Sequence, residues 1–303
     1  MKKLKVSIGI PAYNEERNIK NVLKSILDQK EKSITIKEII VASDGSTDNT
    51  VQFAKSIDDQ RLKVIKYVGR RGKPTILNRL FKIFKGDVLV IVDADSILKD
   101  ELVIESLVSK LHKDKSIGVI TGNPQPLPAE TFLESAINNY IYARNKVFDK
   151  YDIGKSAYTA RGFLVYSKKF LKNFILPDEV INDDTYSYFY CLRNSYRALN
   201  EKGAVVRYRP AQTISEHIKQ STRHLAGGVQ LYRYFGQEAV DKKFSLPKMA
   251  LLRIMLYQLI RNPMGYILLK ALNIYCFYLS RKQVEKFDNK WESISTSKNL
   301  YTR

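Results

Sequence analysis

Cysteine, histidine and tryptophan are scarce in this sequence. Its 303 residues include two cysteines, three histidines and one tryptophan. The two cysteines, Cys191 and Cys276, cannot form a disulfide framework, so we expect a reducing, cytoplasmic environment. The histidines at 112, 217 and 224 lack the spacing of a metal site. These shortages exclude a disulfide-stapled secreted domain and a histidine-based metal domain.

The sequence also lacks an apolar run long enough to span a membrane. After Lys2 and Lys3 the residues alternate in polarity, so no secretory signal is expected. Residues 249–260 and 264–279 are mostly apolar, but both are shorter than the ~20 residues of a spanning helix. Each also contains a Lys or Arg, which costs roughly 2.5–3.5 kcal/mol at a bilayer centre. We expect two helices that lie on a membrane surface, pack on the protein or form a homodimer interface.

Acidic residues are few relative to basic ones. The chain has 51 Lys or Arg against 31 Asp or Glu, a formal net charge of +20, and residues 241–303 contain 12 basic and four acidic residues. This excess favours an anionic partner: nucleic acid, an anionic membrane surface or an anionic substrate. Basic residues beside apolar and aromatic ones favour the membrane surface for the tail. We expect a protein held peripherally on the cytoplasmic face of a membrane.

The first hundred residues alternate between strand and helix patterns. Apolar residues repeat with period two over 4–10 and with helical spacing over 19–27. Repeated strand–helix units predict an α/β fold with a mostly parallel, Rossmann-like central sheet flanked by helices. We expect a catalytic domain over 1–240 and a C-terminal helical appendage over 241–303. Further strands are predicted at 38–42, 63–67, 87–92, 117–121, 157–166 and 204–208, a proline loop at 124–128, and helices at 51–57, 73–84, 130–150, 183–199 and 217–235.

Polar residues follow three of these strands where each strand ends. They are Tyr13-Asn14-Glu15, Asp44-Gly45 and Asp93-Ala94-Asp95. Ligands of parallel α/β sheets bind beyond the carboxyl ends of the strands. Two carboxylates at one strand end could hold Mg²⁺ together with phosphate oxygens and water. A solvated turn with a helix cap explains the same pair equally well.

Asp44 and the basic cluster of Arg70, Arg71 and Lys73 have two interpretations each. Asp44 could accept a hydrogen bond from a base edge, such as the imide N–H of uracil, or could cap a turn. The basic cluster lies among glycines at a helix start, which suits phosphate binding and is also compatible with a solvated loop.

Paired acids and a polar helix face follow later in the chain. Asp183 and Asp184 open a tyrosine-rich helix, where they could supply a general base or interact with the helix dipole. Gln220 and Arg223 lie at i and i+3, and an arginine at that spacing could clamp a phosphate. A solvated helix face would look the same.

In their order along the chain, these motifs resemble the family 2 inverting glycosyltransferases over about residues 4–235. The segment 182–184 is similar to the Glu-Asp motif of that family, with Asp183 in the Glu position. The segment 220–224 is similar to the QxxRW motif of the cellulose, chitin and hyaluronan synthase-like branch. The motifs that carry the resemblance are Ile10-Pro11-Ala12-Tyr13-Asn14-Glu15, Ser43-Asp44-Gly45-Ser46-Thr47-Asp48, Arg71-Gly72-Lys73, Asp93-Ala94-Asp95, Asn182-Asp183-Asp184 and Gln220-Ser221-Thr222-Arg223-His224.

The resemblance implies a GT-A fold and a nucleotide-sugar donor of the UDP or GDP type. It implies that Asp93 contacts the ribose or diphosphate, that Asp95 with Asp93 binds Mg²⁺ or Mn²⁺, and that Asp184, beside Asp183, deprotonates the acceptor hydroxyl. Gln220 and Arg223 would hold the diphosphate and the acceptor. The residues implied to contact the nucleotide are Pro11, Ala12, Tyr13, Glu15, Asp44 and Lys73.

Two departures from the family pattern narrow the expected reaction. His224 replaces the Trp of the motif, and the tail lacks the several membrane-spanning helices of processive synthases. We therefore expect transfer of one or a few sugars to a glycan or a lipid-linked acceptor. The alternatives are a nucleotidyltransferase, disfavoured because no Gly-rich basic segment follows the first strand, and a non-catalytic nucleic-acid-binding protein. The latter is disfavoured because the basic residues are dispersed and the strand ends are acidic.

Overall fold

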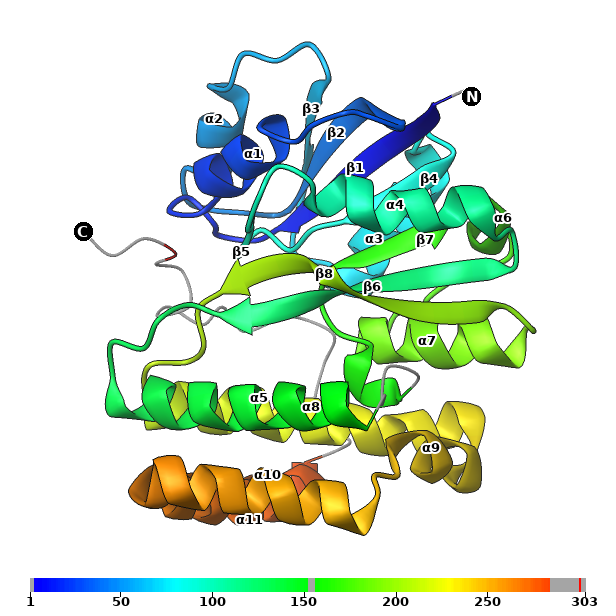
Figure 1. Cartoon of the computed structure of the whole chain (residues 1–303). Coiled ribbons are helices and arrows are strands. Elements are labelled where there is room, and N and C mark those ends of the chain that lie inside the picture. Colours follow the sequence, from blue (N-terminus) through cyan, green and yellow to red (C-terminus); the bar gives the residue numbers. More distant parts are fainter. Residues whose placement is uncertain (1–2, 152–155, 284–299, 301–303) are drawn as a thin grey trace.

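The computed structural model describes residues 3–151, 156–283 and 300, and the described chain builds one eight-stranded sheet. The strand order is β3-β2-β1-β4-β7-β6-β8-β5, and Figure 1 shows the sheet crossing the upper half of the molecule. The strands are β1 (Leu4–Ala12), β2 (Ile34–Asp44), β3 (Leu62–Tyr67), β4 (Val88–Ile91), β5 (Ser96–Leu98), β6 (Ile117–Pro126), β7 (Leu164–Ser167) and β8 (Arg197–Tyr208).

Most strand pairs of the sheet are parallel. β3, β2, β1 and β4 are parallel neighbours, as are β6 and β8, whereas β7 is antiparallel to β4 and β6, and β5 is antiparallel to β8. The predicted mostly parallel α/β sheet is confirmed. Because β1, β2 and β4 run in the same direction, the polar segments that follow them lie at one edge of the sheet.

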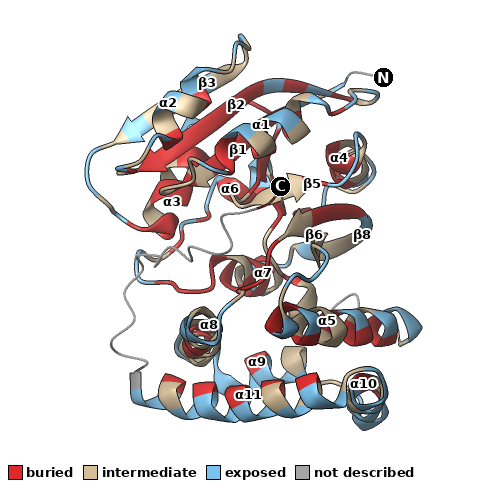
Figure 2. Ribbon diagram, turned by 90° about the vertical axis from the view of Figure 1, so that its left-hand side faces the viewer, coloured by how far each residue is buried: buried red, intermediate tan, exposed pale blue. Residues whose placement is uncertain are grey.

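Helices cover both faces of the sheet, and each face has its own apolar core. Helices α1 (Ile19–Leu27), α2 (Thr50–Lys55) and α4 (Val103–Lys113) pack on one face. Helices α3 (Lys73–Ile83), α6 (Lys168–Leu171) and α7 (Asp183–Arg193) pack on the other. Figure 2 shows the buried strands between these layers. The sheet is thus a rigid support for the loops at its edge.

A separate helical layer lies below the sheet in Figure 1. It contains α5 (Phe132–Lys150), α8 (Ile214–Phe235), α9 (Gln237–Phe244), α10 (Lys248–Arg261) and α11 (Pro263–Gln283). Ala250 and Ile254 of α10 pack against α5, and Leu269 and Leu272 of α11 pack against α5 and α8. The two predicted tail helices therefore pack on the protein. None of the described helices is long and apolar enough to cross a bilayer.

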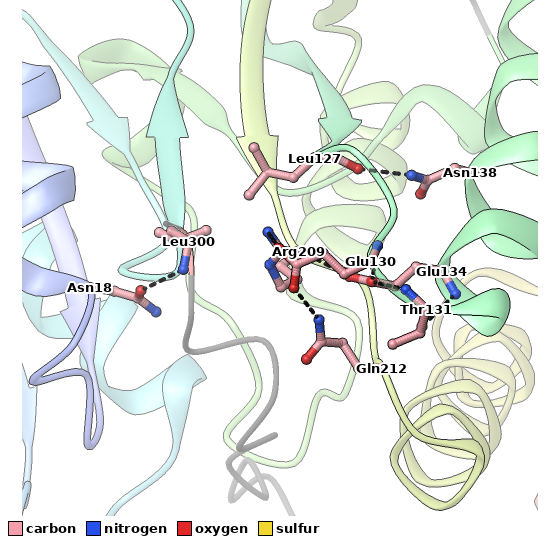
Figure 3. A network of polar contacts seen from close by, with 9 residues as sticks. All are labelled: Asn18, Leu127, Glu130, Thr131, Glu134, Asn138, Arg209, Gln212 and Leu300. Carbon is pink, nitrogen blue, oxygen red and sulfur yellow. Dashed lines mark hydrogen bonds and ion pairs between the residues drawn. The ribbon is translucent and has the colours of Figure 1, made fainter. Parts of the chain in front are cut away.

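A buried ion pair joins the end of β8 to the start of α5 (Figure 3). Arg209 binds Glu134 at 2.9 Å and Glu130 at 3.0 Å. Glu134 also completes a capping box with Thr131, the N-cap of α5. These contacts fix where α5 begins and how it is attached to the sheet.

The predicted proline loop at 124–128 is wrong for its first part. β6 continues through Pro124 to Pro126, where it pairs with β8 alone, since β7 reaches only as far as Thr121. A proline is tolerated where one side of a strand has no hydrogen-bonding neighbour. The prolines therefore mark a part of the strand that is paired on one side.

Two other predicted elements have different lengths in the structure. The strand predicted at 157–166 is a 3₁₀ turn at Ala157–Thr159 followed by β7, because Gly162 adopts a positive φ of 56° between them. The helix predicted at 183–199 ends at Arg193, since Ser195 has φ 59° and the chain then enters β8. Both corrections arise from left-handed backbone positions, which interrupt regular structure.

Candidate active site

The loops that follow β1 and β2 are joined by hydrogen bonds from backbone N–H groups to side-chain oxygens. The backbone N–H of Asn14, which has φ 53°, donates to the Ser46 hydroxyl at 3.1 Å, and the Asn14 side chain accepts from the N–H of Thr47 at 2.9 Å. The N–H of Glu15 donates to the Thr50 hydroxyl at 2.7 Å. The predicted Tyr13–Glu15 and Asp44–Asp48 motifs therefore form one continuous wall of the site.

Asp44 fixes the glycine-rich loop that precedes α3. Its two carboxylate oxygens accept the backbone N–H groups of Arg71 at 2.8 Å and Gly72 at 2.9 Å. Gly45, with φ 71°, lies so close that a Cβ there would be 2.7 Å from the Gly69 carbonyl. The structure thus shows a loop-positioning role for Asp44 that the turn interpretation did not foresee.

Tyr13 and Arg70 stack at this wall. The guanidinium carbon of Arg70 lies 3.8 Å from the centroid of the Tyr13 ring, a cation–π distance. Two of the buried Arg70 nitrogens, Nε and Nη2, have no hydrogen-bond partner among the described residues. Pro11 and Ala12, the last residues of β1, lie directly before Tyr13. The wall therefore presents a flat aromatic and cationic surface next to a carboxylate.

Lys73 joins the acids of β4 and α7. Its Nζ lies 2.8 Å from Asp93 and 3.4 Å from Asp183, and the lysine and Asp183 are buried. Burial opposes the charge of Lys73, but Asp183 and Asp93 outweigh it and raise the pKa of the lysine. Burial, opposed by Lys73, raises the pKa of Asp183 to about 6. The site therefore contains a lysine whose charged form is stabilised by the two acids beside it.

Asp184 and Asp93 lie on two sides of one glycine. The N–H of Gly162 donates to Asp184 Oδ2 at 3.1 Å, and a Cβ at Gly162 would lie 4.0 Å from Asp93 Oδ2. Asp184 Oδ1 accepts the N–H of Thr185 at 2.6 Å. The structure thereby brings together the acids of two motifs that are about ninety residues apart.

Asp93 and Asp95 are suitable ligands for a hard divalent cation. Both are carboxylates that follow β4, and Asp95 is partly exposed beside Asp93. Among the described residues, no group of three His, Cys, Asp or Glu side chains could hold a metal ion by itself. Mg²⁺ commonly takes one or two protein carboxylates and completes its shell with substrate phosphate and water. The pair therefore fits a cation that binds together with a phosphorylated ligand.

Helix α8 approaches the start of α7 through a glycine. The Asn182 side chain donates to the His224 carbonyl at 3.0 Å, and a Cβ at Gly227 would lie only 2.5 Å from Asn182. This contact brings Arg223 and His224 near Asp184, whereas Gln220 is exposed one turn earlier on α8. Burial and then the charge of Arg161 lower the pKa of His224, against the charge of Asp184.

Several residues near these groups belong to none of the motifs predicted from the sequence. Gly162 and Arg161 lie in a short turn, and Arg144 is buried in the middle of α5. The one signal that could have revealed Arg144 is its position, because a charged residue there interrupts the apolar side of an amphipathic helix.

Known proteins identify the family of the chain. The model of glycosyl transferase family 2 matches residues 7–174, more than half of the chain. The glycosyltransferase GlyG of Streptococcus pneumoniae is 30% identical over 47% of this chain and 45% of its own length. The poly-beta-1,6-N-acetyl-D-glucosamine synthase of Staphylococcus epidermidis is 27% identical over 80% of this chain and 59% of its own length. The chain thus spans only about half of these curated relatives.

Solved structures agree with this assignment at the level of the fold. The mannosyltransferase PcManGT from Pyrobaculum calidifontis, in complex with GDP-Man and Mn²⁺, has a TM-score of 0.68 at 18% identity, covering 94% of this chain and 88% of its own. Glucosyl-3-phosphoglycerate synthase from Mycobacterium tuberculosis, with Mn²⁺ and UDP, has a TM-score of 0.52 at 19% identity, covering 77% and 80%.

The chain belongs to glycosyl transferase family 2. Its fold is the GT-A fold of the solved glycosyltransferases that it resembles. The nucleotidyltransferase and nucleic-acid-binding interpretations are therefore not retained.

Proposed function

We propose that the protein is an inverting, metal-dependent glycosyltransferase that moves a sugar from a UDP- or GDP-type donor to an acceptor hydroxyl. The observation that carries this proposal is the arrangement of Asp93 and Asp184 around Gly162, with Lys73 bridging Asp93 and Asp183. The first acid lies at the strand end where a donor phosphate would bind. The second accepts the N–H of the same Gly162, where an acceptor would enter.

The donor would bind along the wall formed by the loops after β1 and β2. Tyr13 and Arg70 offer a stacking surface for the base, and Asp44 can accept from a base edge while it holds the 69–72 loop. Pro11, Ala12 and Glu15 shape the same wall. Bound at Asp93 and Asp95, Mg²⁺ or Mn²⁺ would neutralise the charge of the departing diphosphate.

Asp184 would accept the proton of the attacking hydroxyl. Its carboxylate is held by Gly162 and Thr185, so its orientation is set before an acceptor binds. Direct attack on the side opposite the leaving group inverts the anomeric carbon. Asp183 and Lys73 hold the start of α7 against β4, and Gln220 and Arg223 would hold the diphosphate and acceptor at the mouth.

The tail helices would place this site at an anionic membrane surface. Figure 2 shows that much of α10 and α11 is exposed. The exposed residues of these helices include the apolar Leu256, Leu259, Ile260, Met264, Ile267 and Ile274. Lys248, Arg261, Lys270, Arg281 and Lys282 are exposed on the same two helices. Apolar residues accompanied by basic ones suit an interface with anionic lipid. A glycan or lipid-linked acceptor would then be met at the membrane, and residues 241–303 would act as the attachment unit of the catalytic domain.

A thermal-shift panel of nucleotide sugars, with and without Mn²⁺, tests the catalytic proposal. We expect metal-dependent stabilisation by one UDP- or GDP-sugar, because a ligand of the native state raises stability. The Asp184→Asn variant should keep this stabilisation and lose transfer by at least ~100-fold, the lower end of the contribution of a general base. The proposal fails if no nucleotide sugar stabilises the protein, and the role of Asp184 fails if its variant loses donor binding.

Flotation with anionic vesicles of phosphatidylglycerol tests the tail. We expect the Ile267→Ser/Ile274→Ser variant to lose vesicle binding, whereas Val68→Ser, at an even more exposed apolar residue beyond β3, should bind as the wild type does. If the wild-type protein does not bind the vesicles and elutes as a dimer, and the double variant elutes as a monomer, this face joins two copies of the chain instead.

A further inference from the structure

Three arginines and a histidine lie close enough to interact electrostatically, and the histidine also interacts with Asp184. Arg144 comes from α5, Arg161 from the turn before β7, and Arg223 and His224 from α8. Their charges act on one another: Arg161 acts on Arg144, and Arg161, Arg223 and Arg144 act on His224. No motif discussed above accounts for Arg144 or Arg161.

Among the described residues, no carboxylate forms an ion pair with the buried Arg144. It is 6% exposed, and its Nε and Nη2 bind the neutral side chain of Asn145 at 3.3 and 3.0 Å. Its Nη1 is buried and has no hydrogen-bond partner within the described part of the chain. The rings of Tyr140 and Phe148 lie 5.9 and 5.8 Å from the guanidinium carbon. A buried guanidinium with a donor left over is suited to receive an anion.

The surroundings of Arg144 oppose its charge. Burial and then the charge of Arg161 lower the pKa of Arg144 to about 10, only partly offset by Tyr140 and Tyr208. A folded-state pKa below the ordinary value of 12.5 means that the charged form destabilises the fold at neutral pH. The charged Arg144 therefore lowers the stability of the ligand-free protein, and a bound anion would remove this loss of stability.

We propose that Arg144 and Arg161 form a phosphate-binding subsite for the acceptor. The ligand class is a phosphate or diphosphate ester that also carries the hydroxyl directed at Asp184. The N–H of Gly162, the residue after Arg161, donates to Asp184, so the subsite and the proposed base belong to one short segment. This inference rests on the proposed function, since Asp184 defines the acceptor side.

The subsite is distinct from the donor diphosphate site. Donor phosphate would lie at Asp93, Asp95 and Lys73, beyond β4, whereas Arg144 belongs to α5 in the lower helical layer. Planar guanidinium groups bind phosphate oxygens in pairs, which gives geometric selectivity as well as affinity. The protein would therefore select acceptors that bear a phosphate group over neutral sugars.

Binding of glycerol 3-phosphate to the full chain tests the subsite, at constant ionic strength and with the stabilising nucleoside diphosphate and Mn²⁺ saturating the donor site. We expect Arg144→Met and Arg161→Met each to weaken binding at least ~10-fold, the equivalent of 1.4 kcal/mol. The control Lys146→Met removes an exposed charge from the same helix and should change nothing. Unchanged binding in both arginine variants, or no binding by the wild type, would overturn the proposal.

Melting temperature without phosphate separates a ligand site from a structural role. We expect Arg144→Met to melt at or above the wild-type temperature, because it removes an unbalanced buried charge. A fall of several degrees would mean that Arg144 supports the fold, and would overturn its role as a ligand group. If Arg144→Met fails to fold, the same conclusion follows, and Arg161→Met, at a half-buried residue, still tests phosphate binding.

Transfer assays distinguish the source of the phosphate. A soluble sugar phosphate, a polyisoprenyl-diphosphate sugar in vesicles and the corresponding neutral sugar are compared as acceptors, and release of nucleotide to water is followed without any acceptor. We expect one phosphorylated acceptor to exceed the neutral sugar at least ~10-fold in kcat/KM, and the two arginine variants to lose that preference while retaining hydrolysis. Equal use of the neutral sugar would overturn the subsite alone, whereas absent donor binding would reject the proposed function.

Discussion

Helix α5 is associated with two buried arginines whose surroundings are opposite. At its start, Arg209 is 4% exposed and binds the carboxylates of Glu134 and Glu130. In its later turns, Arg144 is 6% exposed and faces Arg161, tyrosines and one amide. Similar burial therefore accompanies two paired carboxylates at Arg209 and, within the described part of the chain, no paired carboxylate at Arg144.

This difference distinguishes a buried charge that stabilises the fold from a buried charge that is available to bind a ligand. A compensated pair such as Arg209–Glu134 fixes geometry, and its loss exposes the remaining partner to an apolar environment. An uncompensated arginine such as Arg144 does not hold another part of the fold in place through its charge. A bound anion can instead supply the missing negative charge. Three predictions sharpen this distinction.

The largest effect is expected at the compensated arginine. Replacing Glu134 with Leu leaves Arg209 with Glu130 alone, so we expect a loss of about 3 kcal/mol in the free energy of unfolding, at the lower end of the range for broken buried pairs. Urea unfolding measures it. Glu130→Gln, at the more exposed partner, is the matched control and should cost under ~1 kcal/mol. Equal losses in the two variants would abolish the contrast between burial and exposure.

A smaller effect is expected at Lys73, which compensates the acids of the donor side. Lys73→Met leaves Asp93 and Asp183 together without a cation. We expect a loss of about 2 kcal/mol, below the full cost of a broken buried pair, because Asp183 can take up a proton. Thermal unfolding with and without Mn²⁺ measures it, and Mn²⁺ should stabilise the variant more than the wild type. An unchanged melting temperature would show that the acids need no compensation.

The smallest effect is a pH dependence at the compensated end. Burial raises the pKa of Glu134, but hydrogen bonds from the N–H of Glu130 and from Arg209 outweigh it, so the pKa lies below the ordinary 4.5. A lowered carboxyl pKa contributes stability that is present above pH 4.5 and is lost as the pH falls through the folded-state pKa. The stability difference between wild type and Glu134→Gln should therefore shrink in acid, as urea unfolding at pH 7 and pH 4 would show. A difference that stays constant would contradict the assignment.

Periodic patterns predicted the sheet well where a strand or helix has one clear apolar side. β1, α1 and α3 follow the predicted ranges closely, and the two tail helices lie where apolar spacing placed them. Helix α4 has the same kind of spacing, with Val103, Leu107 and Leu111 buried, but it was not among the predicted helices. Local periodicity thus explains most of the fold.

What the sequence did not predict depends on contacts between distant segments. Pro124 fits a strand only because β7 ends before reaching it, and Gly162 takes its backbone conformation between two elements that the sequence does not visibly connect. The motif residues could be named in advance, but the hydrogen bonds of Asp44 to the 69–72 loop could not. Arg161 has no local signature, and Arg144 has only its place on the apolar side of α5, since the role of both depends on which charges the fold leaves near them.

The absence of a side chain at Gly227 allows α8 to lie close to the start of α7. A single added carbon would lie 2.5 Å from the Asn182 side chain, whereas carbon atoms rest about 3.5–4.0 Å apart, so Asn182 would have to give up its hydrogen bond to the His224 carbonyl or the two helices would have to separate. The proposed base begins on one of these helices and Arg223 is carried by the other. The glycine at position 227 therefore helps to set the spacing between Asp184 and Arg223. A larger residue there would disturb that spacing and slow the reaction, although every catalytic side chain would still be present.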